Sequence, residues 1–289
     1  MLSRRDTNNS SVARWLRRRG SRHVSEQAPI VLGGCQRSGT TLLRVMLDSH
    51  SRIACGPESS LLAGSYLPEV LERKFDIPLP DIIALRRQAR DHAHFIELFF
   101  DRYLVLRGKA RWAEKTPRNV RYVAYLWKHF RKAKFIHVIR DGRDVVCSLR
   151  THPRFRLVNG QRVPSGIRRP LSPCINVWLR DTAAGLRWRG HPQYHEVRYE
   201  DLLANSEQTL RRVCELIEEP WEPAMLEYHR EAGGSRDPSK FISNVAATQP
   251  LSDQAVARWR RDLTEEDLAL VEKMTRDRLV ELGYTPSHS

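Results

Sequence analysis

One eight-residue segment, Gly34-Cys35-Gln36-Arg37-Ser38-Gly39-Thr40-Thr41, combines residue types that can hold a phosphate. Its two glycines allow a tight backbone turn whose N–H groups point inward at an anion. Their spacing is that of the phosphate-binding loop G-x-x-x-x-G-K-[ST]. Thr40 stands where a nucleoside-triphosphate enzyme has its lysine, so Arg37 is the candidate for the missing positive charge.

The sequence on either side of this loop predicts a strand before it and a helix after it. Ile30-Val31-Leu32 is a short apolar run typical of a buried strand, and Leu43, Met46 and Leu47 recur at helical spacing within 40–49. A helix that starts after the loop presents unpaired N–H groups and its positive dipole end to an anion. The alternative is that the two glycines form only a tight turn, but the second motif favours the anion site.

That second motif follows the clearest apolar run in the chain, Phe135-Ile136-His137-Val138-Ile139. Arg140 comes directly after this predicted strand, and Ser148 lies about one and a half turns into a helix that starts near Gly142. An arginine and a hydroxyl placed in this way can clamp a phosphate. The sequence Arg140-Asp141-Gly142-Arg143 alone is a common turn. Together with the first loop, it indicates a nucleotide that carries phosphates at two separate positions.

The remaining periodicities predict an α/β fold of the P-loop-like type, a three-layer sandwich with a central parallel sheet flanked by helices. Further strands are expected at 52–55, 111–113 and 195–199, and helices around 120–127, 145–149, 175–188 and after Asn205. A helix-rich insertion is expected at about 60–106 and a long surface loop at 151–173. Thr264 with Asp267 predicts the start of a last helix that ends at Gly283. In such folds the ligand lies beyond the carboxyl ends of the strands.

Composition restricts the class of protein further. The 289 residues carry a net charge of +15, to which the arginine-rich segment 1–27 contributes +5, and this charge favours an anionic ligand. We interpret 1–27 as a basic flexible tail and 28–289 as the domain. Five widely spaced cysteines and the lack of both an apolar membrane span and a signal-peptide core predict a cytoplasmic protein with no metal site.

The chain resembles the sulfotransferases that use 3′-phosphoadenylyl sulfate (PAPS), and it is most similar to their tyrosylprotein sulfotransferase subgroup. The segment 29–44 resembles the family's 5′-phosphosulfate loop, and 134–149 resembles its 3′-phosphate motif; similarity in order extends to about Pro286. Further local matches are Cys55-Gly56-Pro57-Glu58-Ser59, Glu114-Lys115-Thr116-Pro117 and Val197-Arg198-Tyr199-Glu200-Asp201-Leu202.

The resemblance implies a role for each matching residue. Glu58 would be the general base, and Lys115 would stabilise the transition state beside Arg37. The residues implied to contact the nucleotide are Arg37, Ser38, Gly39, Thr40, Thr41, Leu42, Arg140, Ser148 and Tyr199. A late loop would add a serine and a lysine, for which Ser239 and Lys240 are the candidates. Gln249 stands before Pro250 where the family has a further lysine.

Sulfuryl transfer requires in-line approach and positive charge near the transferred group, which Arg37, Lys115 and the helix N-terminus can supply without a metal. The acceptor hydroxyl must also lose its proton. A carboxylate with a pKa near 4.3 is a poor match for a phenol near 10, and partial burial is expected to raise the pKa of Glu58. His50 and His92 are the alternative bases.

The predicted function is transfer of the sulfuryl group from PAPS to an acceptor hydroxyl, with PAP as the product. The resemblance favours a phenol or a peptide tyrosine as acceptor, while sugar, lipid and small-metabolite hydroxyls stay open. One competing hypothesis is a P-loop kinase or NTPase in which Arg37 replaces the lysine. The other is a basic module that binds nucleic acid or a membrane, although we expect no nucleic-acid partner. A homodimer is compatible with the sequence.

Overall fold

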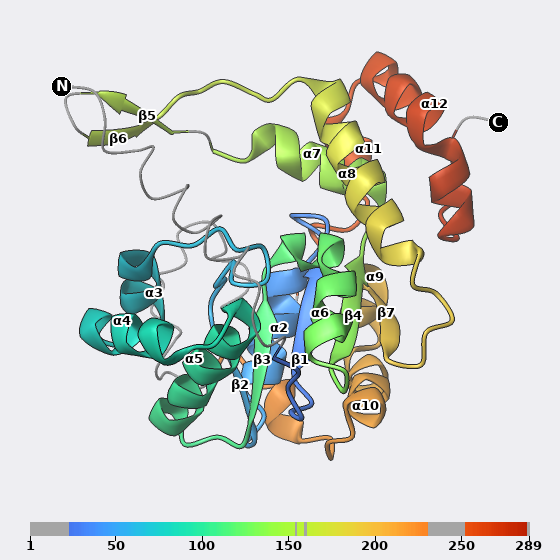
Figure 1. The fold of residues 1–289 in the computed structure, drawn as a ribbon. Coiled ribbons are helices and arrows are strands. Elements are labelled where there is room, and N and C mark those ends of the chain that lie inside the picture. Colours follow the sequence, from blue (N-terminus) through green and yellow to red (C-terminus); the bar gives the residue numbers. More distant parts are fainter. Residues whose placement is uncertain (1–22, 154, 159–160, 231–251, 288–289) are drawn as a thin grey trace.

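The computed structural model describes residues 23–153, 155–158, 161–230 and 252–287. Its centre is a five-stranded sheet in the order β2-β3-β1-β4-β7, in which every pairing is parallel (Figure 1). The strands are β1 (Ile30–Gly34), β2 (Ile53–Cys55), β3 (Arg111–Lys115), β4 (Lys134–Ile139) and β7 (Tyr194–Arg198). The predicted α/β fold with a central parallel sheet is therefore confirmed, and each predicted strand is present.

Helices cover both faces of this sheet because its strands alternate their apolar side chains between two cores. Ile30 and Leu32 of β1 pack with α2 (Thr40–Asp48) and α10 (Ser206–Ile217) on one face. Val31, between them, faces the other core, which contains α5 (His92–Arg107) and α6 (Val123–His129). Strands buried on both faces are near-continuously apolar, which is why the run Ile30-Val31-Leu32 shows no alternation.

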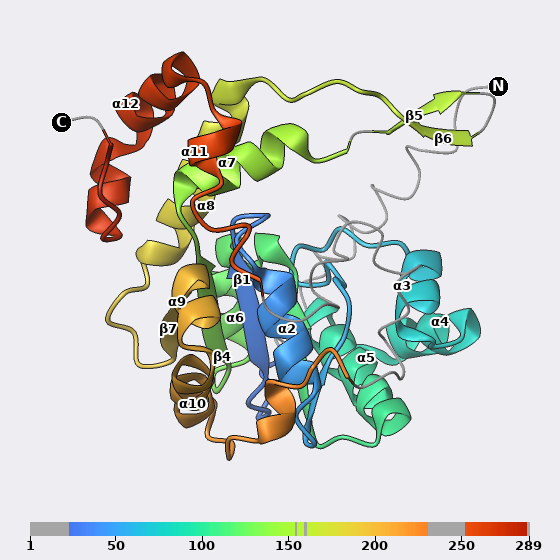
Figure 2. The same ribbon diagram turned by 180° about the vertical axis from the view of Figure 1, so that it is seen from behind.

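A third group of helices lies beyond the carboxyl ends of the strands (Figures 1 and 2). It comprises α7 (Gly142–Thr151), α8 (Leu171–Leu186), α11 (Trp259–Asp262) and α12 (Glu265–Glu281). Helix α7 begins at Gly142 as predicted, with the Asp141 side chain accepting a hydrogen bond from the N–H of Arg143 at 2.9 Å. Thr264 caps α12 by accepting from the N–H of Asp267 at 3.1 Å, which confirms the predicted start.

The predicted long loop at 151–173 was wrong in one respect. It contains an antiparallel hairpin of β5 (Phe155–Val158) and β6 (Gln161–Pro164), which lies far from α12 (Figure 1). The two strands flank the dipeptide Asn159-Gly160, which is a strong sequence signal for a hairpin. The prolines and glycines around it hid this signal because they suggested an irregular loop.

The other elements connect these layers. The helix-rich insertion predicted after Ser60 is present as three helices, and short elements follow β3, β7 and α10. The connecting elements are α3 (Pro68–Phe75), α4 (Leu79–Gln88), α5, η1 (Pro117–Arg121), α9 (Tyr199–Ala204) and η2 (Pro223–Met225).

The division into a tail at 1–27 and a domain at 28–289 stays a prediction, since 1–22 lie outside the described residues. Ser25, within the described part of that segment, is buried and donates its N–H to the carbonyl of His129 at 2.8 Å. All five cysteines are free and buried. Among the described residues, no helix is long and apolar enough to cross a membrane.

Gly34 lies where the backbones of β1 and β4 approach each other closely at their carboxyl ends. It has a φ of 151°, and an added Cβ would lie 2.3 Å from the carbonyl oxygen of Val138. Gly108 also has a positive φ, of 60°, but nothing lies within 4 Å of an added Cβ. We predict that Gly108→Ala costs about 1 kcal/mol of unfolding free energy. Gly34→Ala should cost at least about 2 kcal/mol more, because two paired backbones cannot separate. Equal losses in urea unfolding would contradict this.

Candidate active site

The loop between β1 and α2 makes a tight turn directly before the start of the helix. Arg37 and Gly39 both adopt positive φ angles, 72° and 92°. Ser38 donates its N–H back to the carbonyl of Cys35 at 3.2 Å, which closes the turn. Within the described part of the chain, no side chain caps the start of α2. The first N–H groups of the helix and its dipole are therefore directed at the space beyond the loop.

Position 39 requires glycine for two reasons, its positive φ angle and the close packing of a neighbouring side chain. A Cβ at this position would lie 2.2 Å from Cδ2 of Tyr199, the first residue of α9. The Tyr199 ring therefore packs directly on the loop backbone. The guanidinium of Arg140 lies over this ring, with its Cζ 4.6 Å from the ring centroid. The predicted nucleotide residues Gly39, Arg140 and Tyr199 thus lie in one cluster.

Arg140 and Arg37 connect the two strand-end motifs. Nη1 of Arg140 donates to the backbone carbonyl of Arg37 at 3.1 Å, and Nε of Arg37 donates to Oγ of Ser148 at 3.0 Å. Burial, together with the charge of Arg140 nearby, lowers the pKa of Arg37. The sequence paired Ser148 with Arg140, whereas in the structure its hydroxyl contacts Arg37. Two cations this close are more stable when an anion lies between or beside them.

Two buried polar atoms at this cluster lack partners among the described residues. They are Oγ of Ser38 and Nε of Arg140, whose residues are 1% and 5% exposed. A buried donor left without a partner costs about 1–3 kcal/mol, so such atoms mark a place where a ligand can restore the hydrogen bonds. Their donor chemistry and the adjacent charges fit phosphate groups.

Lys115, at the end of β3, is placed between the helix start and Glu58. Its Nζ donates to Oε1 of Glu58 at 2.6 Å and to Oγ1 of Thr41 at 3.3 Å. The Lys115 side chain is 3% exposed, whereas that of Glu58 is 40% exposed. The pair therefore has a buried cation adjacent to the glycine loop and a carboxylate that reaches solvent. Lys74 fixes the backbone here by donating to the carbonyl of Glu58 at 2.7 Å.

The pKa of Glu58 differs from the sequence-based expectation. Burial acts to raise the pKa of this carboxyl, as expected, but the charge and the hydrogen bond of Lys115 outweigh it. The net result is a pKa below the ordinary value of 4.5. The expectation of a raised pKa was wrong because the sequence did not show that the neighbouring lysine would be an ion-pair partner.

Sequence reasoning assigned no role to Glu114, although it is adjacent to Lys115. Its buried carboxylate accepts from the hydroxyls of Ser59 and Thr116, both at 2.7 Å, and from the amide of Asn119. Burial raises the pKa of Glu114. Glu114 thereby ties the segment that carries Glu58 to the end of the strand that carries Lys115. The sequence signal that could have indicated a role for Glu114 is an acidic residue at a strand end, directly before a lysine with a predicted function.

The remaining predicted residues divide into three groups. Thr40 and Leu42 are buried, and Leu42 packs its side chain into the core. Ser239, Lys240 and Gln249 lie outside the described residues. Nε2 of His50 donates to the backbone carbonyl of Pro220 at 2.8 Å, and Nε2 of His92 donates to that of Leu61 at 2.7 Å. Burial lowers the pKa of His92 to about 4. No group of three or more metal-binding side chains occurs in the described part of the chain.

The fold and the site together define an α/β protein with clustered cationic side chains at the carboxyl edge of its sheet, next to a lysine–glutamate pair. Comparison with known proteins identifies its family. The profile of the sulfotransferase family matches residues 29–223. The chain belongs to this family, and it is a sulfotransferase enzyme close to the tyrosylprotein sulfotransferases.

Individual relatives agree with this assignment. The chain is 28% identical to protein-tyrosine sulfotransferase 1 of Danio rerio over 275 residues, which is 89% of this chain and 72% of that protein. The sulfotransferase domain of the Synechococcus PCC 7002 olefin synthase has the same fold, with a TM-score of 0.68, 19% identity and coverage of 92% and 98%. A mouse sulfotransferase complexed with PAP gives a TM-score of 0.53, 14% identity and coverage of 90% and 88%.

The Lys115–Glu58 ion pair makes a direct prediction. In Lys115→Met, the Glu58 carboxyl loses the ammonium that lowers its pKa most, so the pKa of Glu58 should rise above its wild-type value. An NMR titration of side-chain carboxyl carbons measures this change. Lys128→Met, at an exposed position on α6, is the control and should leave the pKa of Glu58 unchanged. A Glu58 pKa that is equal in both variants would contradict the ion pair.

Proposed function

We propose that this sulfotransferase takes PAPS as its sulfuryl donor and transfers the group in line to an acceptor hydroxyl, with Glu58 as the general base and PAP as the product. The observation that carries the proposal is the joining of two anion-binding strand ends through Arg140 and Arg37, next to the Lys115–Glu58 pair. Two such ends fit a nucleotide with two separate phosphate positions. The PAP complex of the similarly folded mouse enzyme supports this choice.

The nucleotide would be held by groups from three elements. The N–H groups at the start of α2, with Ser38, Thr40 and Thr41, would bind its 5′ end, and Arg37 would balance the charge there. The 3′-phosphate would be bound by Arg140, whose Nε has no partner in the described structure, and by Ser148. Tyr199 would pack beside the nucleotide. The candidates Ser239 and Lys240 would complete the site.

The transfer itself would occur between the loop and Glu58. Lys115 touches both Glu58 and Thr41, so its ammonium can shift from the carboxylate towards negative charge that develops at the start of α2. Such a shift would remove the charge that holds the pKa of Glu58 down. The base would then be strongest when the acceptor is losing its proton.

The low pKa of Glu58 also determines when the proton moves. A carboxylate with a pKa below 4.5 cannot remove the proton from a free phenol of pKa about 10 before transfer. Once the bond to sulfur has begun to form, the acceptor oxygen becomes far more acidic. Proton transfer to Glu58 would therefore be late, and the exposed part of its side chain would face the acceptor.

The proposed acceptor is a phenolic hydroxyl, as on a peptide tyrosine. The support is the similarity to protein-tyrosine sulfotransferases along 89% of the chain. The other partner is the nucleotide, and no metal takes part in the proposed chemistry. Screening tyrosine peptides, simple phenols, sugars and alcohols with radiolabelled PAPS tests the proposal. Labelled product from no acceptor class, in a protein that hydrolyses ATP with Mg²⁺, would contradict it and favour the P-loop kinase hypothesis.

Glu58→Gln should separate catalysis from nucleotide binding. Loss of the base should lower kcat by roughly 10²–10⁴-fold. The affinity for PAP, measured by calorimetry, should change less than about threefold, since the amide retains the size of the side chain. Glu207→Gln, an exposed residue of α10, serves as the control and should retain full activity. Wild-type turnover by Glu58→Gln would exclude the base assignment.

The pH dependence of kcat/KM, compared between single variants, tests whether Glu58 or a histidine is the base. A depressed carboxyl pKa keeps the base ionised above pH 4.5, so activity should fall only as the pH drops through that lower pKa. The acid limb is therefore expected below pH 4.5. An acid limb that persists in Glu58→Gln but disappears in His50→Gln or His92→Gln would instead identify that histidine as the base.

A further inference from the structure

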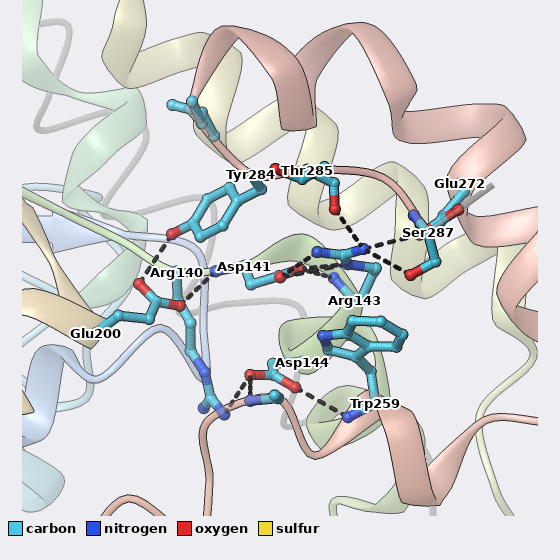
Figure 3. Close-up of polar contacts among 12 residues, drawn as sticks. Arg140, Asp141, Arg143, Asp144, Glu200, Trp259, Glu272, Tyr284, Thr285 and Ser287 are labelled. Atoms are coloured by element: carbon cyan, nitrogen blue, oxygen red, sulfur yellow. Dashed lines mark hydrogen bonds and ion pairs between the residues drawn. The ribbon is translucent and has the colours of Figure 1, made fainter. Parts of the chain in front are cut away.

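The segment 255–259, which we name the strap, lies against Arg140 at the end of β4 and is bound to α7 by one side chain. Oδ2 of Asp144 accepts from the N–H of Ala257 at 2.9 Å, and Oδ1 accepts from the N–H of Trp259 at 3.0 Å (Figure 3). Asp144 is fully buried, so these two bonds are not shared with solvent. Both carboxylate oxygens are needed to hold the strap.

The same carboxylate faces the arginine of the nucleotide site. Nη2 of Arg140 lies 3.5 Å from Oδ2 of Asp144 and also donates to the carbonyl of Ala255, at the start of the strap. Arg140 therefore binds the first residue of the strap, and Asp144 binds its middle and its last residue. The strap in turn limits where the guanidinium of Arg140 can lie. Asp144 thus acts on Arg140 both directly and through the strap.

The strap requires such fastening because its backbone is not in a relaxed conformation. Ala257 has a φ of 52°, which is unfavourable for an L-residue with a side chain. Its N–H is one of the two groups that Asp144 binds. The strap also places Arg258 close enough to Arg37 to help lower the pKa of that guanidinium. A displaced strap would therefore change the charge at both phosphate positions.

We infer that Asp144 is a positioning residue for nucleotide binding: it fixes the strap against Arg140 and so sets the geometry of the proposed 3′-phosphate site. This inference rests on the proposed function, because it needs Arg140 to bind the nucleotide. Asp144 itself touches no reacting group. Its effect should appear in nucleotide affinity and in KM, and the turnover at saturating nucleotide should be spared.

Electrostatics and strap positioning make opposite predictions for Asp144→Asn. Removing a negative charge beside a phosphate site would, by itself, strengthen the binding of an anion. The asparagine has one acceptor oxygen where the aspartate has two, so one of the two strap N–H groups would be left without a partner. If positioning dominates, binding must weaken. The sign of the change in affinity therefore decides between the two effects.

Glu272 of α12, which binds Arg143 next to Asp144, provides a matched control. It is a buried carboxylate of α12, 2% exposed, that accepts from Nη1 of Arg143 at 2.8 Å and from the N–H of Ser287 at 2.8 Å (Figure 3). It thus has the same kinds of partners as Asp144, an arginine and a backbone N–H. Its arginine is Arg143, which stacks on Trp259 at the far end of the strap from Arg140 and is not part of the nucleotide cluster. Glu272→Gln should therefore lose stability without losing nucleotide affinity.

The experiment measures PAP binding by calorimetry for the wild type, Asp144→Asn and Glu272→Gln, with steady-state kinetics in PAPS. Asp144→Asn should bind PAP about tenfold more weakly or worse, with KM for PAPS raised equally and kcat within about threefold of the wild type. Glu272→Gln should bind PAP within about twofold of the wild type. Unchanged or tighter binding by Asp144→Asn, or an equal loss in Glu272→Gln, overturns the inference.

Amide hydrogen exchange of the wild type gives a second readout, which does not depend on the variant folding. The N–H groups of Ala257 and Trp259 should be protected in the presence of PAP. Exchange at the rate of an unstructured peptide would overturn the inference even if Asp144→Asn does not fold. A wild type that binds no PAP, with these two amides protected, would instead contradict the proposed nucleotide.

Discussion

The hydrogen bond from Arg140 to the backbone carbonyl of Arg37 is the contact on which the site depends. It joins the end of β4 to the loop after β1, so two motifs whose arginines are 103 residues apart form one cationic surface, which we propose binds the nucleotide. The parallel sheet brings the two motifs together, because β1 and β4 are neighbours and end at the same edge. Gly34 permits the close approach of the two strands, and the Tyr199 ring packs against the guanidinium of Arg140.

The balance of charge in this cluster explains why its cationic side chains are paired with carboxylates. Arg37, Arg140 and Lys115 converge at one edge of the sheet, where burial penalises uncompensated cations. Carboxylates lie close to these cations, with Asp144 beside Arg140 and Glu58 beside Lys115. These carboxylates hold the cations in place and also compete with a ligand for them. An anionic ligand can therefore replace the carboxylates as the ion-pair partner of these cations.

The sequence predicted the fold class, and it predicted several residues that the structure brings together in the candidate site, because both patterns are local. An apolar strand followed by Gly34 or Arg140 is visible in a few residues. The Glu58–Lys115 pair and its lowered pKa could not be predicted from local sequence, since the partners come from segments 57 residues apart. The roles of Glu114 and Asp144 were missed for the same reason. The hairpin at 155–164 was missed although its Asn159-Gly160 signal is local, because neighbouring prolines argued for a loop.

The central claim is that one site binds two phosphate groups of a single nucleotide. Calorimetric titration of the wild-type chain with PAP and with adenosine 5′-monophosphate tests it directly, since the two ligands differ only in the 3′-phosphate. A charge-assisted contact of Arg140 with that group should make PAP bind about 30-fold more tightly or better. Equal affinities for the two nucleotides would contradict the account.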